Sequence, residues 1–338
     1  MKRAFISMLI PLVLITACSN SDNSFTDPND DPPPPPPPGG FAITPSNGLQ
    51  VSQVAYQSVV TSGDMAGLTG GTGLTAGGGN GFSKPGIDAQ IGGLLGRVMQ
   101  TVPLPPIETI CGSGPGTFTV TFDVVDPLVF ATGALSAGDT ILVEYDNCDE
   151  GFGEILDGTI DFTVDAFTGD LLVTNLFDVT MTMNLVDFQV TIGTDVMMSN
   201  GDATARLNNL AAPFVSASVT GNMMTTDMNS SSEVLTSYSS AQTVDAGLDP
   251  APFTMTASGT LNSSQLNGAV SYSTPTPFTG FDLNYPSAGV LLVTSGESSA
   301  RLIAVNDVDV RIEIYSNADG SGTPDETILT TWAELEGA

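Results

Sequence analysis

The chain has 338 residues, of which 37 are Asp or Glu and only 7 are Lys or Arg, giving a formal net charge of −30 at pH 7. Such a charge repels phosphate backbones and therefore excludes nucleic acid as an expected partner. The absence of histidine excludes Ser–His and Cys–His catalysis and every His-ligated zinc or copper site.

Residues 1–17 contain the successive regions of an export signal in their usual order. Lys2 and Arg3 precede an apolar stretch of about a dozen residues, too short to span a bilayer comfortably. Ile15-Thr-Ala-Cys18 follows and resembles the lipobox of bacterial lipoproteins. The resemblance implies cleavage before Cys18 and its lipidation, so the membrane becomes a partner through the lipid anchor. An ordinary cleaved signal with an incidental cysteine is the alternative.

Residues 18–40 are predicted to be a disordered tether behind the lipidated Cys18. The proline run from Pro32 to Pro38 favours polyproline II and forms a semi-rigid spacer of roughly 20 Å. Ser19 follows the lipidated cysteine where an Asp would retain a lipoprotein in the inner membrane of enterobacteria. The expected location is therefore the outer membrane, on its periplasmic or cell-surface face.

Residues 41–105 form a helical and glycine-rich lead-in. A first short helix is predicted with Ser46 as its N-cap, because the apolar residues after it have helical spacing. These residues are Leu49, Val51, Val54, Ala55 and Val59. The stretch Gly63–Gly81 is too rich in glycine to hold regular structure cheaply. A second amphipathic helix is predicted from Pro85 to Gln100.

From residue 106 to 338 the apolar residues alternate with polar ones, as in residues 118–124, 160–164, 179–185 and 308–314. One apolar face and one polar, solvent-exposed face are typical of an antiparallel sheet that is packed on one side. The chain is therefore predicted to be mainly β, a large antiparallel meander that forms either a sandwich or an open, barrel-like sheet. A weak echo between residues 156–162 and 266–272 leaves two related halves possible.

The phase of this alternation changes once. Apolar residues hold odd positions up to Leu185 and even positions from Val186 to Ile192. A strand cannot slip by one residue without turning its core face to water. A β-bulge or tight turn is therefore predicted near Leu185–Val186.

Cys111 and Cys148 remain after Cys18 is lipidated. An even pair in an oxidising compartment predicts a disulfide. The loop-entropy model gives such a bridge a stabilisation of roughly 4 kcal/mol.

One loop near the end of the chain has the composition of a calcium site. Oxygen-bearing side chains occur there at every second position, an arrangement from which six to eight oxygens can converge on the ion. They belong to Asn317, Asp319, Ser321, Thr323 and Asp325. The twelfth position is Ile328, so the bidentate glutamate of an EF-hand loop is missing. The alternative is a polar β-hairpin loop, and apart from calcium no cofactor is expected.

Two further stretches resemble a group of uncharacterised proteobacterial outer-membrane lipoproteins. The first combines Gly133-Ala-Leu-Ser-Ala-Gly-Asp-Thr140 with Asn147-Cys148 and Leu156-Asp-Gly-Thr159, and the second runs from Tyr285 to the closing Trp332-Ala-Glu-Leu335. The resemblance implies a β scaffold with one disulfide and assigns no catalytic residue. The hairpin loop of that group is richer in Asp and Gly, so Ser321 departs from its pattern.

These features lead to a lipid-anchored cell-envelope protein that is not an enzyme, with a surface structural, adhesion or binding role toward an unknown envelope partner. The alternative is an envelope carrier that binds an apolar ligand in a curved sheet. A carboxylate-dependent hydrolase comes third, because no Asp–Glu pair is singled out by an apolar setting. A ligand-sized apolar cavity favours the carrier, and a packed core favours the structural module.

Overall fold

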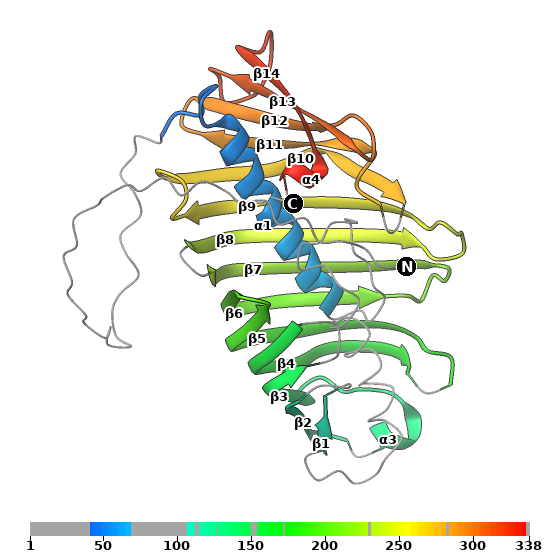
Figure 1. Ribbon diagram of the computed structural model, residues 1–338. Helices are drawn as coiled ribbons and strands as arrows, with labels where there is room; N and C mark the ends of the chain where they lie inside the picture. Colours follow the sequence, from blue (N-terminus) through cyan, green and yellow to red (C-terminus); the bar gives the residue numbers. More distant parts are fainter. Residues whose placement is uncertain are drawn as a thin grey trace, which may run out of the picture. The chain divides into compact units, whose positions relative to one another are not determined.

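The computed structural model describes residues 41–68, 107–111, 115–126, 128–149, 154–171, 173–228, 231–281 and 284–335. Fourteen strands follow one another in a single antiparallel sheet, each beside its neighbours in sequence (Figure 1). The strands are β1 (Ile107–Ile110), β2 (Thr117–Asp123), β3 (Thr140–Asp149), β4 (Glu154–Asp170), β5 (Leu176–Ile192), β6 (Asp195–Asn208), β7 (Phe214–Met228), β8 (Ser231–Asp245), β9 (Pro252–Ser263), β10 (Ala269–Phe281), β11 (Ala288–Ser295), β12 (Ser298–Ala304), β13 (Asp309–Tyr315) and β14 (Glu326–Thr331).

The sheet is not closed, because β1 and β14 lie at its two ends in the strand order. This confirms the predicted mainly β, antiparallel architecture and selects its open form. Short helices α3 (Val129–Thr132) and α4 (Trp332–Leu335) sit at the ends of strands. Residues 156–162, one half of the weak echo, lie within β4, whereas residues 266–272 turn into β10, so the two stretches occupy different local structures.

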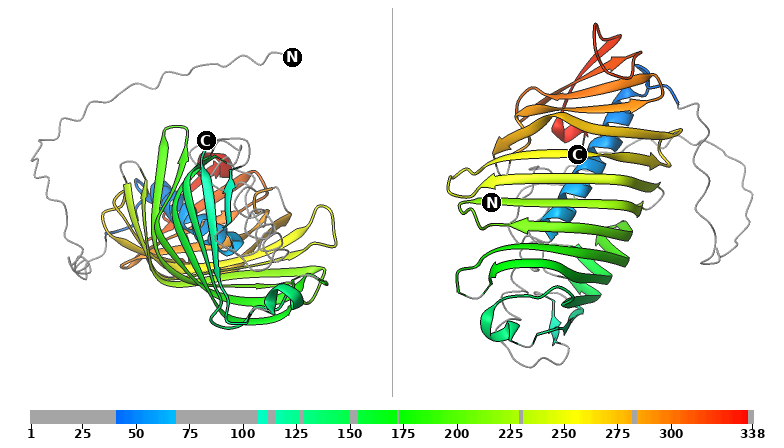
Figure 2. Two further views of the ribbon diagram at one scale, coloured as in Figure 1. Left: turned by 90° about the horizontal axis from the view of Figure 1, so that it is seen from below. Right: turned by 180° about the vertical axis from the view of Figure 1, so that it is seen from behind.

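Helix α1 (Gly48–Leu68) lies across the strands on the concave side of the sheet (Figure 2). It packs against β6 to β9 and β11 to β13. The residues that were predicted to form its apolar face are buried, except for the half-buried Leu49. A core on this side explains why the sheet needs only one apolar face.

The ends of α1 differ from the prediction. Asn47, not Ser46, precedes the helix, and its Oδ1 accepts a hydrogen bond from Thr44 N at 2.7 Å. The Ser46 hydroxyl instead pairs with that of Thr44. The helix also continues past Gly63 to Leu68, into a stretch predicted to lack regular structure. Because tertiary packing supplies most helical stability in proteins, the docked residues before Gly63 outweigh the low propensity of glycine.

The alternation of the strands separates an inner from an outer face. In β5, Met181 and Met183 are each 1% exposed, whereas Thr182 between them is exposed. The predicted bulge is present, since the pairing of β5 with β6 shifts between Leu185 and Phe188. Val186 lies in the bulge and is exposed, so the new core phase begins at Phe188 and not at Val186.

An aromatic cluster closes the core where α4 meets α1. Trp332 is fully buried, and its ring centroid lies 4.9 Å from that of Tyr56 on α1 and 5.9 Å from those of Phe278 and Tyr285. Its indole Nε1 donates to the carbonyl oxygens of residues 286 and 306, each at 3.1 Å. Aromatic pairs at such distances add about 0.5–1.5 kcal/mol each beyond area burial. The cluster therefore ties the first described helix to the last.

Two tyrosine rings of the inner face lie over glycines of the strands beside them. Gly221 of β7 pairs with Tyr238 of β8, and Gly259 of β9 pairs with Tyr272 of β10. A Cβ on Gly221 would come within 2.2 Å of Tyr238 Cζ, and a Cβ on Gly259 within 2.7 Å of Tyr272 Oη. Glycine is needed at both positions because each ring occupies the space of the missing side chain.

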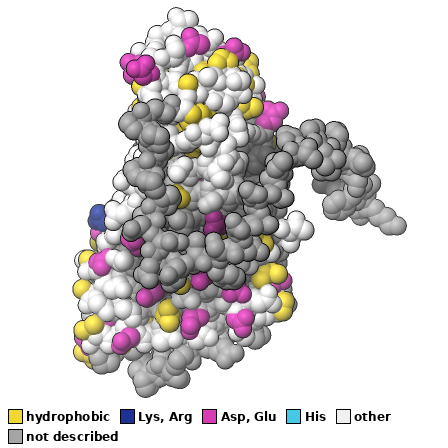
Figure 3. Space-filling view, turned by 90° about the vertical axis from the view of Figure 1, so that its left-hand side faces the viewer, with side chains coloured by type: hydrophobic (Ala, Val, Ile, Leu, Met, Phe, Trp, Pro, Cys, Tyr) yellow, Lys and Arg dark blue, Asp and Glu magenta, His cyan; other side chains and the backbone are white. Residues whose placement is uncertain are grey.

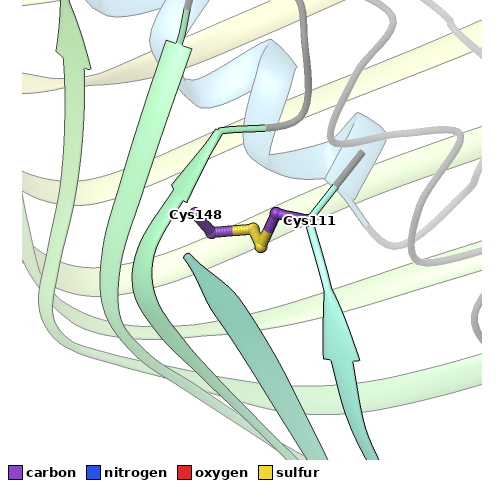
Figure 4. Close-up of a disulfide and its surroundings, with 2 residues drawn as sticks. All are labelled: Cys111 and Cys148. Carbon is purple, nitrogen blue, oxygen red and sulfur yellow. A yellow bond between two sulfur atoms is a disulfide. The ribbon is translucent and has the colours of Figure 1, made fainter. Parts of the chain in front are cut away.

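The predicted disulfide joins Cys111, directly after β1, to Cys148 in β3 (Figure 4). The two Cα atoms are 5.3 Å apart, within the usual range for such a bridge. Both cysteines are buried. The bond fastens the first edge of the sheet to its third strand.

Several predictions fall outside the described residues. They are the signal segment, lipidation of Cys18, the tether of residues 18–40 and the second helix from Pro85 to Gln100. Among the helices that are described, none combines the length and apolarity required of a membrane span.

Candidate functional sites

A groove of about 880 Å³ opens at the end of the sheet where β11 turns into β12 and β13 leads toward β14. It is lined by Ala42, Ile43, Thr44, Pro45, Ser295, Gly296, Glu297, Ser298, Ile314, Ser316 and Asp325. Ile43 N donates to Ser298 Oγ at 2.7 Å, and Ser298 Oγ donates to Ser295 O at 2.9 Å. The segment before α1 is therefore fixed to the β11–β12 turn.

The chemistry of this groove is mixed. Ile43 and Ile314 supply apolar surface, and Glu297 and Asp325 are exposed carboxylates. None of the described residues that line it has an aromatic side chain on which a sugar ring could stack. The groove therefore lacks the platform that would point toward the hydrolase hypothesis.

The predicted calcium loop lies beside this groove, between β13 and β14. Asn317 Oδ1 and Asp319 Oδ1 accept hydrogen bonds from Ser321 N at 3.2 and 3.1 Å, and Asp319 Oδ1 also accepts from Ser321 Oγ at 2.9 Å. Three of the five predicted ligands are thus brought together. Thr323 is exposed, and Asp325 lines the groove. Because two of these oxygens already accept hydrogen bonds within the loop, its geometry matches the polar hairpin alternative, and calcium binding stays a prediction.

The outer face carries a row of hydroxyl side chains that crosses every strand from β3 to β10. Each member is the register partner of the next: Thr140, Thr163, Thr182, Thr204, Thr220, Ser239, Ser258 and Ser273. All are exposed or half-buried. Since neighbouring strands are spaced by about 4.8 Å, this hydroxyl row extends over roughly 35 Å.

On the face of the molecule seen in Figure 3, acidic side chains far outnumber basic ones among the described residues. Thr182 Oγ1 donates to Asp165 Oδ2 at 3.0 Å. Nearby, Arg206 Nη2 and Asp178 Oδ2 form an ion pair at 2.6 Å. Hydrogen bonding to Arg206 lowers the pKa of the Asp178 carboxyl.

The inner face contains a second polar row, and it is buried. Ser199, Thr226, Glu233 and Ser263 are successive register partners across β6 to β9, and each is at most 7% exposed. Burial raises the pKa of Glu233. The sequence contained a signal for this residue, because Glu233 has the same parity as the buried Leu235 of its strand. For the outer hydroxyl row, the sequence predicted only a polar, solvent-exposed face, because the alignment of the hydroxyls across strands depends on strand register.

Comparison of the chain with protein-family models, with curated proteins and with solved structures returned no match.

Proposed function

We propose that the chain is a lipid-anchored outer-membrane protein of the cell envelope without enzymatic activity, and that its outer sheet face binds a neutral polysaccharide. The observation that carries the proposal is the hydroxyl row across β3 to β10. Lipidation of Cys18 would hold this face near the membrane through the tether.

The chemistry of the row favours a polyhydroxylated ligand. Serine and threonine hydroxyls both donate and accept hydrogen bonds, as sugar hydroxyls do. They stand on paired strands, so their spacing is set before a ligand arrives and little ordering entropy is lost on binding. A net charge of −30 opposes anionic polymers, which leaves neutral chains as the favoured class.

The packed inner side supports the same choice over a carrier. The buried apolar residues form one continuous cluster in which α1 takes part. The groove described above is open and mixed in character, unlike an enclosed apolar cavity. A packed core was the expected mark of the structural module as opposed to the carrier.

Cosedimentation with insoluble polysaccharides tests the proposal. The test variant replaces Thr182, Thr204 and Thr220 by valine, which keeps the β-branched shape and removes three hydroxyls. The matched control replaces Thr243, Thr254 and Thr279, three successive register partners outside the row that are exposed or half-buried, by valine. At about 0.5–1.5 kcal/mol per hydrogen bond, the triple variant should bind at least roughly tenfold more weakly.

The expected result is binding to cellulose, chitin or starch granules, weaker binding to an anionic gel, and loss of binding in the triple variant only. Failure of the unaltered protein to bind any of the neutral polymers would refute the proposed ligand. Equal loss in the control variant would assign the binding to the sheet in general and not to the row.

The apolar-ligand carrier remains a second candidate because of one observation. The inner face of β4 and β5 is apolar, with Phe162, Met181 and Met183, and α1 makes its main contacts with later strands; a ligand would require these three buried side chains to become accessible. Methionine side chains adapt readily to irregular ligands. Mass spectrometry of an organic extract of the purified protein tests this candidate: a stoichiometric lipid supports it, and an empty extract from native membranes contradicts it.

A further inference from the structure

The buried polar row of the inner face includes a single carboxylate, Glu233, and this residue faces α1. Ser263 Oγ donates to Glu233 Oε1 at 3.4 Å, and the Ser199 and Thr226 hydroxyls lie 3.4 Å apart. Ser58 of α1 faces the same carboxyl. Glu233 is thus the point at which an ionisable group of the sheet meets the docked helix.

Two hydroxyls buried on the inner side of the molecule are unsatisfied. The hydroxyls of Ser52 on α1 and Ser240 on β8 are buried and have no hydrogen-bond partner within the described part of the chain. Ser58 and Ser62 of α1 donate to carbonyl oxygens of their own helix. A buried polar group without a partner costs about 1–3 kcal/mol, so the Ser52 hydroxyl makes docking of α1 less favourable than an apolar side chain would.

Within the described part of the chain, no basic side chain pairs with Glu233. The titratable groups that face it from the packed elements are the Tyr272 hydroxyl of β10 and, through Tyr272, the Tyr238 hydroxyl of β8. Burial raises the pKa of both phenols, that of Tyr238 to about 12, so both stay neutral at ordinary pH. Ser58 and Ser263 offset only part of the desolvation of the carboxyl. Ionisation of Glu233 therefore places an unpaired charge beneath the helix, which is costly.

We propose that Glu233 is a proton-sensitive latch for α1: the helix stays docked while this carboxyl is protonated, and ionisation favours its release from the sheet. Release would expose the buried polar row together with the Tyr238 and Tyr272 rings. This inference goes beyond the proposed function, because it does not depend on what the outer face binds.

The direction of the pH effect follows from linkage. Glu233 has a raised pKa when α1 is docked and its ordinary value, 4.5, when the site is open to water. Docking is therefore strongest in acid and weakens as pH rises between the two values. In that window the equilibrium constant for release should rise up to tenfold per pH unit and then level off above the docked pKa.

Hydrogen exchange of the α1 amides, corrected for intrinsic rates and measured from pH 4 to pH 9, tests the latch in the full chain. The protein should show the predicted rise in opening, and Glu233→Gln should abolish it because the amide cannot ionise. Glu144→Gln, an exposed glutamate of β3, is the matched control and should behave like the unaltered protein. An unchanged pH profile in Glu233→Gln would overturn the proposal.

A second readout keeps the test decisive if Glu233→Gln folds poorly. Trp332, the only tryptophan, contacts Tyr56 of α1, so release of the helix should alter its emission. Binding of an apolar dye should rise over the same pH window. Constant emission and constant dye binding in the unaltered protein across that range would also refute the latch.

Discussion

Alanine at Gly221 sets two physical effects of opposite sign against each other. The backbone there is not in the left-handed region, so alanine is conformationally allowed. Glycine inside a strand is less favourable than alanine by about 0.5–1 kcal/mol, so propensity alone predicts that the substitution stabilises the protein. The structure predicts the reverse, because the new Cβ would lie 2.2 Å from Tyr238 Cζ and 2.3 Å from its Oη.

The size of the destabilisation follows from the contacts that the Tyr238 ring loses when it moves aside for the new Cβ. Overpacking of a core typically costs 1–3 kcal/mol. The ring also carries the hydrogen bond from Tyr238 Oη to Asp202 O at 3.3 Å, whose loss costs about 0.5–1.5 kcal/mol more. After subtraction of the propensity gain, Gly221→Ala should lower the free energy of unfolding by about 0.5–4 kcal/mol.

Urea unfolding followed by Trp332 fluorescence measures this change, with the midpoint compared at constant slope. The double-mutant cycle with Tyr238→Leu supplies the control, since removal of the ring should make Gly221→Ala neutral or stabilising. A Gly221→Ala protein that is more stable than the unaltered chain would refute the steric reasoning. Equal destabilisation in both backgrounds would place the cause outside the Gly221–Tyr238 contact.

Three other changes have expected outcomes. Replacement of Cys111 and Cys148 by serine should lower stability by about 2–4 kcal/mol, seen as a lower urea midpoint that reduction of the unaltered protein reproduces. Trp332→Leu should cost about 3 kcal/mol or more, measured by calorimetry, because the buried ring and both its hydrogen bonds are lost. Arg206→Ala should lower the free energy of unfolding by less than about 1 kcal/mol, because the ion pair is exposed. It should also let the pKa of Asp178 rise toward its ordinary value, which NMR titration measures. The stabilisation by this ion pair is present above pH 3.8 and is lost as pH falls through the lowered pKa of Asp178.

The β architecture was predictable because period-two alternation is a local signal. It also located the bulge of β5, since a change of phase cannot occur without an extra residue. The number of buried sheet faces was predictable for the same reason, because strands with polar residues at every second position cannot be buried on both sides.

The extent of α1 and the buried place of Glu233 were not predictable in this way. The helix passes Gly63 because its buried positions dock on strands that begin more than a hundred residues later. The buried serines of α1 resemble a solvent-facing surface in sequence, and their burial follows from docking of the helix on distant strands. The hydroxyl row likewise required the registers of seven strand pairs, which no local pattern encodes.

The order of the strands has a consequence for how the chain reaches its native state. Each strand pairs with the one just made, so the sheet has a low contact order and is able to grow hairpin by hairpin. Helix α1 is synthesised before any of them, yet its docking surface includes β11 to β13, and Ile43 must reach Ser298, 255 residues away. Closing so long a loop is entropically costly until the sheet exists. The earliest described element to leave the ribosome is therefore expected to be among the last to settle.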